Sequence, residues 1–190
     1  MAKQADAAEM RASESAYRAS HRTSAGARIA AGIAAGTLAG ILMIGCMMVY
    51  ASVTDAGATM PLKALGALVY GVEALVAGPT AMLVGVLIQL ALSIVIGILF
   101  ALFVSRETST VAALFTGIIV GVALWAAMDL FVLPRANPTM AARIALMPLG
   151  YFVAHVLFGV GLAMSPAFIR MFAREHRDRV RVPAQQILPI

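Results

Sequence analysis

The chain has 190 residues, of which 62% are hydrophobic and 12% charged, with a formal net charge of +5. An ordinary soluble domain carries about 25% charged and about 45–50% apolar residues. This composition leaves too little polar surface to cover a water-soluble globule, so we expect a membrane protein. The single cysteine, Cys46, excludes a disulfide within the chain.

Four apolar runs are long enough to cross a membrane. A transmembrane helix needs about 20 apolar residues, and its backbone groups have to be paired within the helix because lipid offers no partners. The sequence therefore predicts an all-α membrane protein with four transmembrane helices arranged in two hairpins. The predicted spans cover about residues 29–53, 80–104, 111–133 and 145–171. The short SRETS loop also predicts a tight hairpin between spans two and three.

The segments outside the spans differ in character. Residues 1–28 predict a polar and basic tail, flexible or weakly helical, and residues 172–190 a second basic tail. Between spans one and two, about residues 60–78 are too apolar for a loop, yet Lys63 and Glu73 make them a poor span. Pro61 suits a first helical turn. We expect an amphipathic helix at the outer membrane interface, with a shallow re-entrant segment as the alternative.

Basic residues are distributed unevenly between the two sides. Eleven of the fourteen lie in the tails or beside them, or between spans two and three, whereas Lys63, Arg135 and Arg143 lie on the other side. Because basic residues stay in the cytoplasm, both termini are predicted to be cytoplasmic in a bacterial inner membrane. The arginines expected at anionic lipid headgroups are Arg22, Arg28, Arg170, Arg174 and Arg177. Neither tail interleaves aromatic residues for base stacking, which argues against nucleic-acid binding.

Small and polar residues recur every four positions within each span. Residues four apart share one helix face, and small residues at this spacing let membrane helices approach closely. The glycines predicted to pack helices together are Gly32, Gly36, Gly40, Gly85, Gly97, Gly117, Gly121 and Gly159. Gly-x-x-x-Gly opens both span one and span three, which suggests an internal duplication into two hairpins of the same orientation.

The same stripes carry the buried polar residues Gln89, Ser93, His155 and Asp129. We predict that His155 is a neutral hydrogen-bonding residue inside the bundle with Gln89 as its partner, Ser93 or a backbone carbonyl across the bundle being the alternatives. Because ionisable groups inside a membrane are candidate functional sites, a proton-relay or transport role stays open. We expect Asp129, near the outer end of span three, to form an ion pair with Arg135 or Arg143.

The sequence lacks the motifs that several kinds of chemistry require. The sequence has no His/Cys spacing for a metal, no phosphate-binding loop and no nucleophile elbow, so we expect neither an enzyme nor a metal site. No cofactor is predicted. An axial haem ligand at His155 is the alternative, and it would need a second ligand from another chain because His21 and His176 lie in the tails.

The ordered motifs resemble an uncharacterised bacterial family of four-span inner-membrane proteins. They are AGIAAGTLAGILM, MPLKALGALVYG, LVGVLIQLALSIVIGILFAL, GVALWAAMDLFVLP and FVAHVLFGVGLA, over about residues 29–164. Trp125, Pro134, His155 and Gly159 match the family pattern, while Gln89 stands where the family often has histidine. The resemblance implies no assigned activity, and Gln89 removes a strong iron ligand.

These features favour an accessory or structural subunit that lies in the lipid bilayer beside other membrane protein subunits, as in an electron-transfer complex. The alternative is a small oligomeric transporter or channel in which Gln89, Ser93 and His155 form the polar path. A homo-oligomer is compatible with both.

Overall fold

The computed structural model describes the backbone of residues 2–185 and the side chains of residues 25–175. Within that range the chain is helical and contains no strand. The helices are α1 (Ala2–Val53), α2 (Met60–Tyr70), the 3-10 helix η1 (Gly71–Leu75), α3 (Pro79–Phe103), α4 (Thr110–Ala127), the π-helix η2 (Met128–Val132), α5 (Leu133–Ala136), α6 (Pro138–Ile144), α7 (Pro148–Leu162) and α8 (Ser165–Gln185). Four segments are long and apolar enough to cross a membrane, namely Ala25–Val53, Pro79–Phe103, Thr110–Ala136 and Pro148–Glu175. The all-α membrane fold is confirmed.

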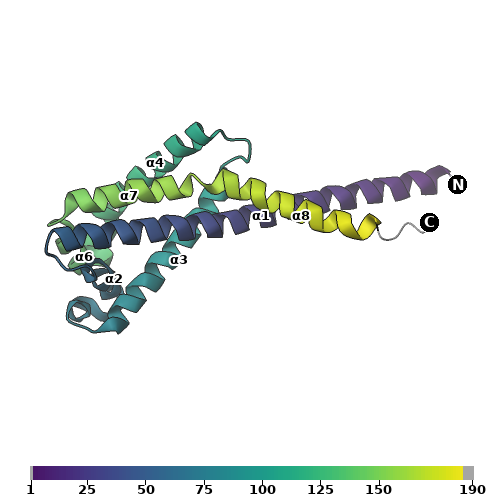
Figure 1. The fold of residues 1–190 in the computed structure, drawn as a ribbon. Helices are drawn as coiled ribbons and strands as arrows, with labels where there is room; N and C mark the ends of the chain where they lie inside the picture. Colours follow the sequence, from purple (N-terminus) through teal and green to yellow (C-terminus); the bar gives the residue numbers. More distant parts are fainter. Residues whose placement is uncertain (1, 186–190) are drawn as a thin grey trace.

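The four spanning segments form an open layer in the order α3, α1, α7, α4 (Figure 1). The long helix α1 packs against α3 on one side and against α7 and α8 on the other, while α4 packs against α7. The predicted tight hairpin between spans two and three is therefore wrong: the loop after α3 leads α4 away to the far edge of the layer. The two packed hairpins are α1 with α3 and α4 with α7.

The helix ends follow from local sequence. Pro79, Pro138 and Pro148 each stand in a first helical turn, where a missing N–H costs no hydrogen bond. The hydroxyl of Ser109 caps α4 by accepting from the N–H of Ala112 at 3.2 Å. At the other extreme, α1 continues as one helix back to Ala2, so its first residues are helical where a flexible or weakly helical tail was expected.

Prolines modify the last two spans. The third span passes from α4 into the π-helix η2 just before Pro134, whose ring would collide with a carbonyl one turn earlier in a regular α-helix. The fourth span is interrupted at residues 163–164, between α7 and α8, immediately before Ser165 and Pro166. The buried Ser165 hydroxyl donates to the Leu162 carbonyl at 2.8 Å, and α8 then continues to Gln185.

Short helices cover the end of the layer opposite the chain termini (Figure 1). The predicted interfacial helix is present as α2 and η1, and α2 packs along α3. A side chain at Gly66 would overlap the backbone of Ala81, and one at Gly85 would overlap the backbone of Leu62. The two helices therefore touch backbone to backbone, which holds α2 firmly on the first two turns of α3.

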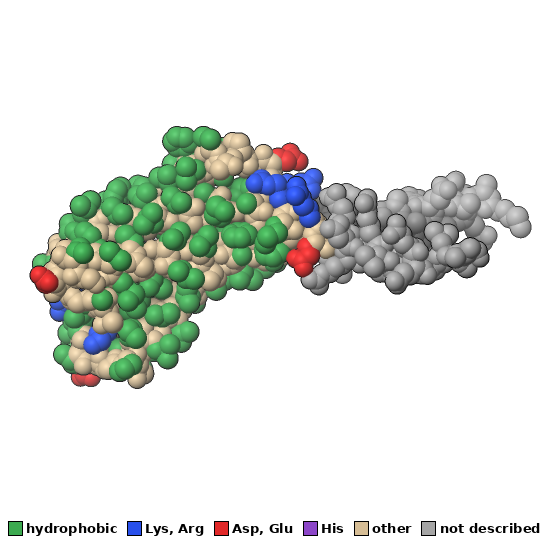
Figure 2. Space-filling view, in the orientation of Figure 1, with side chains coloured by type: hydrophobic (Ala, Val, Ile, Leu, Met, Phe, Trp, Pro, Cys, Tyr) green, Lys and Arg blue, Asp and Glu red, His purple; other side chains and the backbone are tan. Residues whose placement is uncertain are grey.

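The surface of the layer suits lipid. Figure 2 shows hydrophobic side chains over the whole visible length of the layer, with charged side chains gathered at its two ends. The densest basic group lies at the end where α1 and α8 leave the layer. A belt of apolar side chains between two charged ends is the distribution that a bilayer selects.

Candidate functional site

Glycine contacts hold each hairpin together. In the first hairpin, a side chain at Gly32 or Gly97 would overlap the backbone of the facing helix, and one at Gly36 would overlap the Ser93 carbonyl. In the second, Gly117 and Gly159 face one another in the same way, and a side chain at Gly121 would overlap the His155 carbonyl. The remaining predicted glycines, Gly40 and Gly85, lie against the Ser93 side chain and the Leu62 backbone. All eight glycines singled out in the sequence lie at helix contacts.

These contacts recur between the two hairpins in a fixed register. Gly36 meets the carbonyl of Ser93 as Gly121 meets that of His155, and Gly97 meets Gly32 as Gly159 meets Gly117. Ser93 therefore occupies in the first hairpin the place that His155 occupies in the second.

A cavity of about 180 Å³ lies between the two edge helices. Its walls come from α3 and from α4 with its π-helical extension, its floor from α1 and α7, and its end from α2, α5 and α6. Its lining includes Gln89, Leu92, Ser93, Leu124, Tyr151 and His155. Three of the four polar residues predicted to be buried thus face one apolar cavity.

The His155 side chain is only 4% exposed. Its Nδ1 lies 3.0 Å from the carbonyl oxygen of Tyr151, one turn earlier in α7, and the two rings meet edge to face with centroids 4.4 Å apart. A carbonyl can only accept, so Nδ1 carries the proton and Nε2 presents a lone pair. The predicted hydrogen bond to Gln89 is wrong: the ring bonds a carbonyl of its own helix, and the Gln89 amide lies against Ser93 and Met43 instead.

Gln89 and Ser93 form a separate pair on α3. The Ser93 hydroxyl donates to the Gln89 carbonyl at 2.7 Å, and the Gln89 amide nitrogen lies 3.3 Å from that hydroxyl and 3.2 Å from the sulfur of Met43 on α1. A thioether is a weak acceptor. The Gln89 amide is therefore only loosely engaged, within reach of the same cavity as His155.

Asp129 and Trp125 flank this site on the third span. Asp129 lies in η2, half-buried, and within the described residues it forms no ion pair with Arg135 or Arg143, contrary to expectation. The Arg135 guanidinium donates instead to the Phe131 carbonyl at 2.8 Å. Trp125 packs edge to face on Phe152 with centroids 5.1 Å apart, and its buried Nε1 has no hydrogen-bond partner in the described part of the chain.

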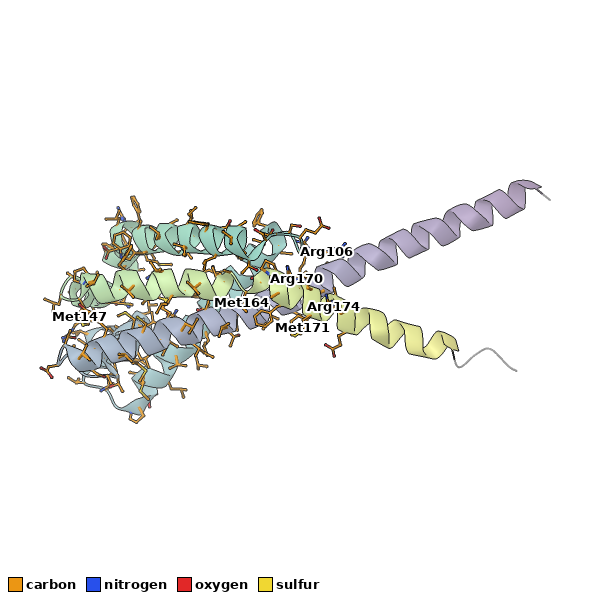
Figure 3. All side chains as sticks on the ribbon, turned by 45° about the horizontal axis from the view of Figure 1, so that its top comes forward. Arg106, Met147, Met164, Arg170, Met171 and Arg174 are labelled. Atoms are coloured by element: carbon orange, nitrogen blue, oxygen red, sulfur yellow. The ribbon has the colours of Figure 1, made fainter. Side chains whose placement is uncertain are left out.

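The arginines expected at headgroups divide into two kinds. Arg28 donates from one guanidinium nitrogen to the carbonyls of Ala101, Leu102 and Val104, at 2.9–3.2 Å, so it caps the C-terminal end of α3 instead of reaching outward. Arg170 donates to the carbonyl of Arg106 at 2.9 Å, and Figure 3 shows Arg106, Arg170 and Arg174 together where α8 leaves the layer. The side chains of Arg22 and Arg177 lie outside the described residues.

Sequence reasoning missed several contact residues. One of them is Asn137, which is 2% exposed. Its Nδ2 donates to the Ala64 carbonyl at 2.9 Å, and its Oδ1 accepts from the Met140 N–H at 3.0 Å. An Asn directly before a Pro at the first helical position signals an N-cap. A second signal was the four-residue series of small or flexible side chains on α1 beside the glycines, all buried: Ala27, Ala31, Ala35, Ala39, Met43, Met47 and Ala51.

In comparisons with protein-family models, curated proteins and solved structures, none matches this chain. No group of three or more His, Cys, Asp or Glu side chains within the described residues could hold a metal ion. The site is thus defined by its own geometry: a membrane-embedded cavity, apolar on its walls, with His155, Gln89 and Ser93 on its polar side.

Proposed function

We propose that this integral membrane protein is a non-catalytic accessory subunit of a larger membrane complex, one that carries electrons being the candidate host. We place it in the bacterial inner membrane with both termini in the cytoplasm. We also propose, from the motifs quoted above, that it belongs to the uncharacterised four-span family they resemble.

The observation that carries the proposal is the open edge formed by α4. Of the spanning helices, α4 packs along α7 alone, and its far side exposes Val111, Phe115 and Ile119. A four-helix protein that acts alone buries more helix surface by closing its layer into a bundle in which each helix has two neighbours. Because α4 has one main neighbour among the spanning helices, its far side is open to a helix of another subunit.

The proposed orientation rests on the charges. The basic cluster of Arg106, Arg170 and Arg174 lies at the end where α1 and α8 leave the layer, while Lys63, Arg135 and Arg143 lie in the short helices at the opposite end. The excess of positive charge supports a cytoplasmic location for the first end.

Site-specific photo-crosslinking in native membranes tests the subunit role. A photoreactive residue at Ile119, which is 66% exposed on α4, should yield one discrete adduct with another protein. The matched control is Leu87, 58% exposed on α3, which should yield less of that adduct. Adducts only with lipid, or only with a second copy of this chain, would contradict a role as accessory subunit.

A second function is favoured by one observation, the placement of Gln89, Ser93 and His155 around a single cavity. These are the residues that a polar path for a small solute or proton would use. In proteoliposomes, a transporter should show a flux that His155→Leu abolishes while the protein stays folded. A haem protein should instead show a Soret band that the same substitution removes.

A further inference from the structure

We propose that the cavity between α3 and α4 binds a ring-headed amphiphile that donates a hydroxyl hydrogen bond to Nε2 of His155 and extends its apolar tail into the bilayer. This inference concerns a small-molecule ligand and does not depend on the subunit role proposed above. It rests on the volume of the cavity, on the hydrogen-bonding of the two His155 ring nitrogens, and on the side to which the cavity opens.

The cavity has the volume of a single ring. A cavity of about 150 Å³ lined by aliphatic and aromatic side chains binds benzene in another protein, and the present one measures about 180 Å³. Its walls are mostly Leu, Met and Phe side chains, with few polar groups, which is the usual make-up of a small-molecule site. One six-membered ring with a polar substituent fits this space, whereas a porphyrin does not.

His155 supplies an unused acceptor to this space. Because Nδ1 donates to the Tyr151 carbonyl, Nε2 carries the lone pair, and it accepts no hydrogen bond from any described residue. The side chain is more than nine-tenths buried and lines the cavity. An acceptor without a partner in a lipid-facing space is unfavourable, because an acyl chain offers no donor. The occupant therefore has to bring one.

Gln89 and Ser93 restrict the occupant further. Their side chains line the same cavity, and the Gln89 amide is held only by a thioether and a hydroxyl at 3.3 Å. The occupant therefore meets polar side chains on α3 as well as on α7. A phenol combines the ring, the donor and weak polarity in one group.

The cavity opens sideways, toward lipid. Leu68, Leu92 and Val132 line it and are all more than two-fifths exposed, and they come from α2, α3 and the extension of α4. This exposed rim is apolar and lies on or beside the spanning helices, so the opening suits the hydrocarbon layer. A ligand with an apolar tail can thus enter from the bilayer and leave its tail there.

Binding of para-heptylphenol to the full chain in phosphatidylcholine nanodiscs tests the proposal, with its methyl ether para-heptylanisole as the matched ligand without a donor. Calorimetric titration, corrected with empty nanodiscs, should show the phenol binding about three- to tenfold more tightly than the ether, as expected for one hydrogen bond. Equal affinities would overturn the hydrogen bond. Binding no greater than in empty nanodiscs would overturn the site. The comparison of phenol with ether and the comparison with empty nanodiscs both use the unaltered protein.

Substitutions at His155 and Leu124 then test where the ligand binds. His155→Phe keeps an aromatic ring at this position and removes the acceptor. The affinity for the phenol should therefore fall to that for the ether, while the affinity for the ether stays the same. Leu124→Trp should fill the cavity and weaken both ligands at least tenfold, whereas Ile119→Trp, on the outer face of α4, should change neither. An undiminished preference for the phenol in His155→Phe, or full binding in Leu124→Trp, would overturn the assignment.

Discussion

Asn137 joins two parts of the outer end through one side chain. Its amide donates to the Ala64 carbonyl of α2 while its oxygen caps α6. Asn137→Ala leaves a buried carbonyl and a buried N–H without partners, so we expect the free energy of unfolding to fall by about 1–3 kcal/mol. Thermal unfolding in detergent measures this, with Thr116→Ala as the control, since the Thr116 hydroxyl only bonds back to Ala112 on an exposed face. Equal losses in the two variants would argue against the bridging role.

The glycines of α1 allow a comparison at single residues within one helix. A methyl group at Gly36 would overlap the Ser93 carbonyl, whereas the space beside Gly45 is open. We expect Gly36→Ala to lower the unfolding free energy by about 1–3 kcal/mol through overpacking, and Gly45→Ala to change it by less than about 1 kcal/mol. Detergent-resistance and thermal-unfolding curves of the pair decide the matter. If both variants unfold like the parent protein, α1 does not approach α3 closely at Gly36.

At the scale of single elements, α3 ends on a cap supplied by another helix. The Arg28 guanidinium binds three carbonyls in the last turn of α3, where the helix dipole concentrates negative charge. Arg28→Met should cost about 1.5–3 kcal/mol, because charged hydrogen bonds are lost together. Arg106→Ala is the control, since the exposed side chain of Arg106 pairs, within the described part of the chain, with the exposed Glu107 alone, at 3.7 Å. A matched effect of both would indicate a general charge effect at this end of the layer.

The elements show what sequence reasoning can and cannot reach. Span positions follow from hydropathy because lipid tolerates no unpaired backbone, and the predicted bounds agree closely with Pro79–Phe103. Glycine spacing predicts that one face of a helix packs closely on another helix, but it does not identify that helix. The partner of span three was therefore predicted wrongly. The bond of His155 was missed because residue spacing does not show whether a ring nitrogen turns to a carbonyl of its own helix. The π-helix at Met128–Val132 depends on how Pro134 is accommodated, which pattern alone leaves open.

At the scale of the whole molecule, the loop between α3 and α4 connects helices that lie on opposite edges of the layer. Lengthening this loop by about ten Gly/Ser residues should therefore cost less than about 1 kcal/mol, since loop entropy grows slowly with length. The same insertion at residues 163–164, where α7 passes into α8 against α1, should prevent stable assembly. Monodispersity and thermal unfolding of the two variants provide the comparison. A large loss from the loop insertion would mean that α3 and α4 need their short connection.

Because α4 is attached mainly on one side, the helices of the layer should differ in how often they open locally. α3 is held by α1, α2 and the Arg28 cap, whereas α4 is held mainly by its contact with α7. Local opening starts where the fewest contacts break, so amide hydrogens of α4 should exchange with deuterium well before those of α1 and α3. When α4 swings out, the wall containing Leu124 leaves with it and His155 meets the bilayer directly. How often that happens would set the rate at which anything inside the cavity is replaced.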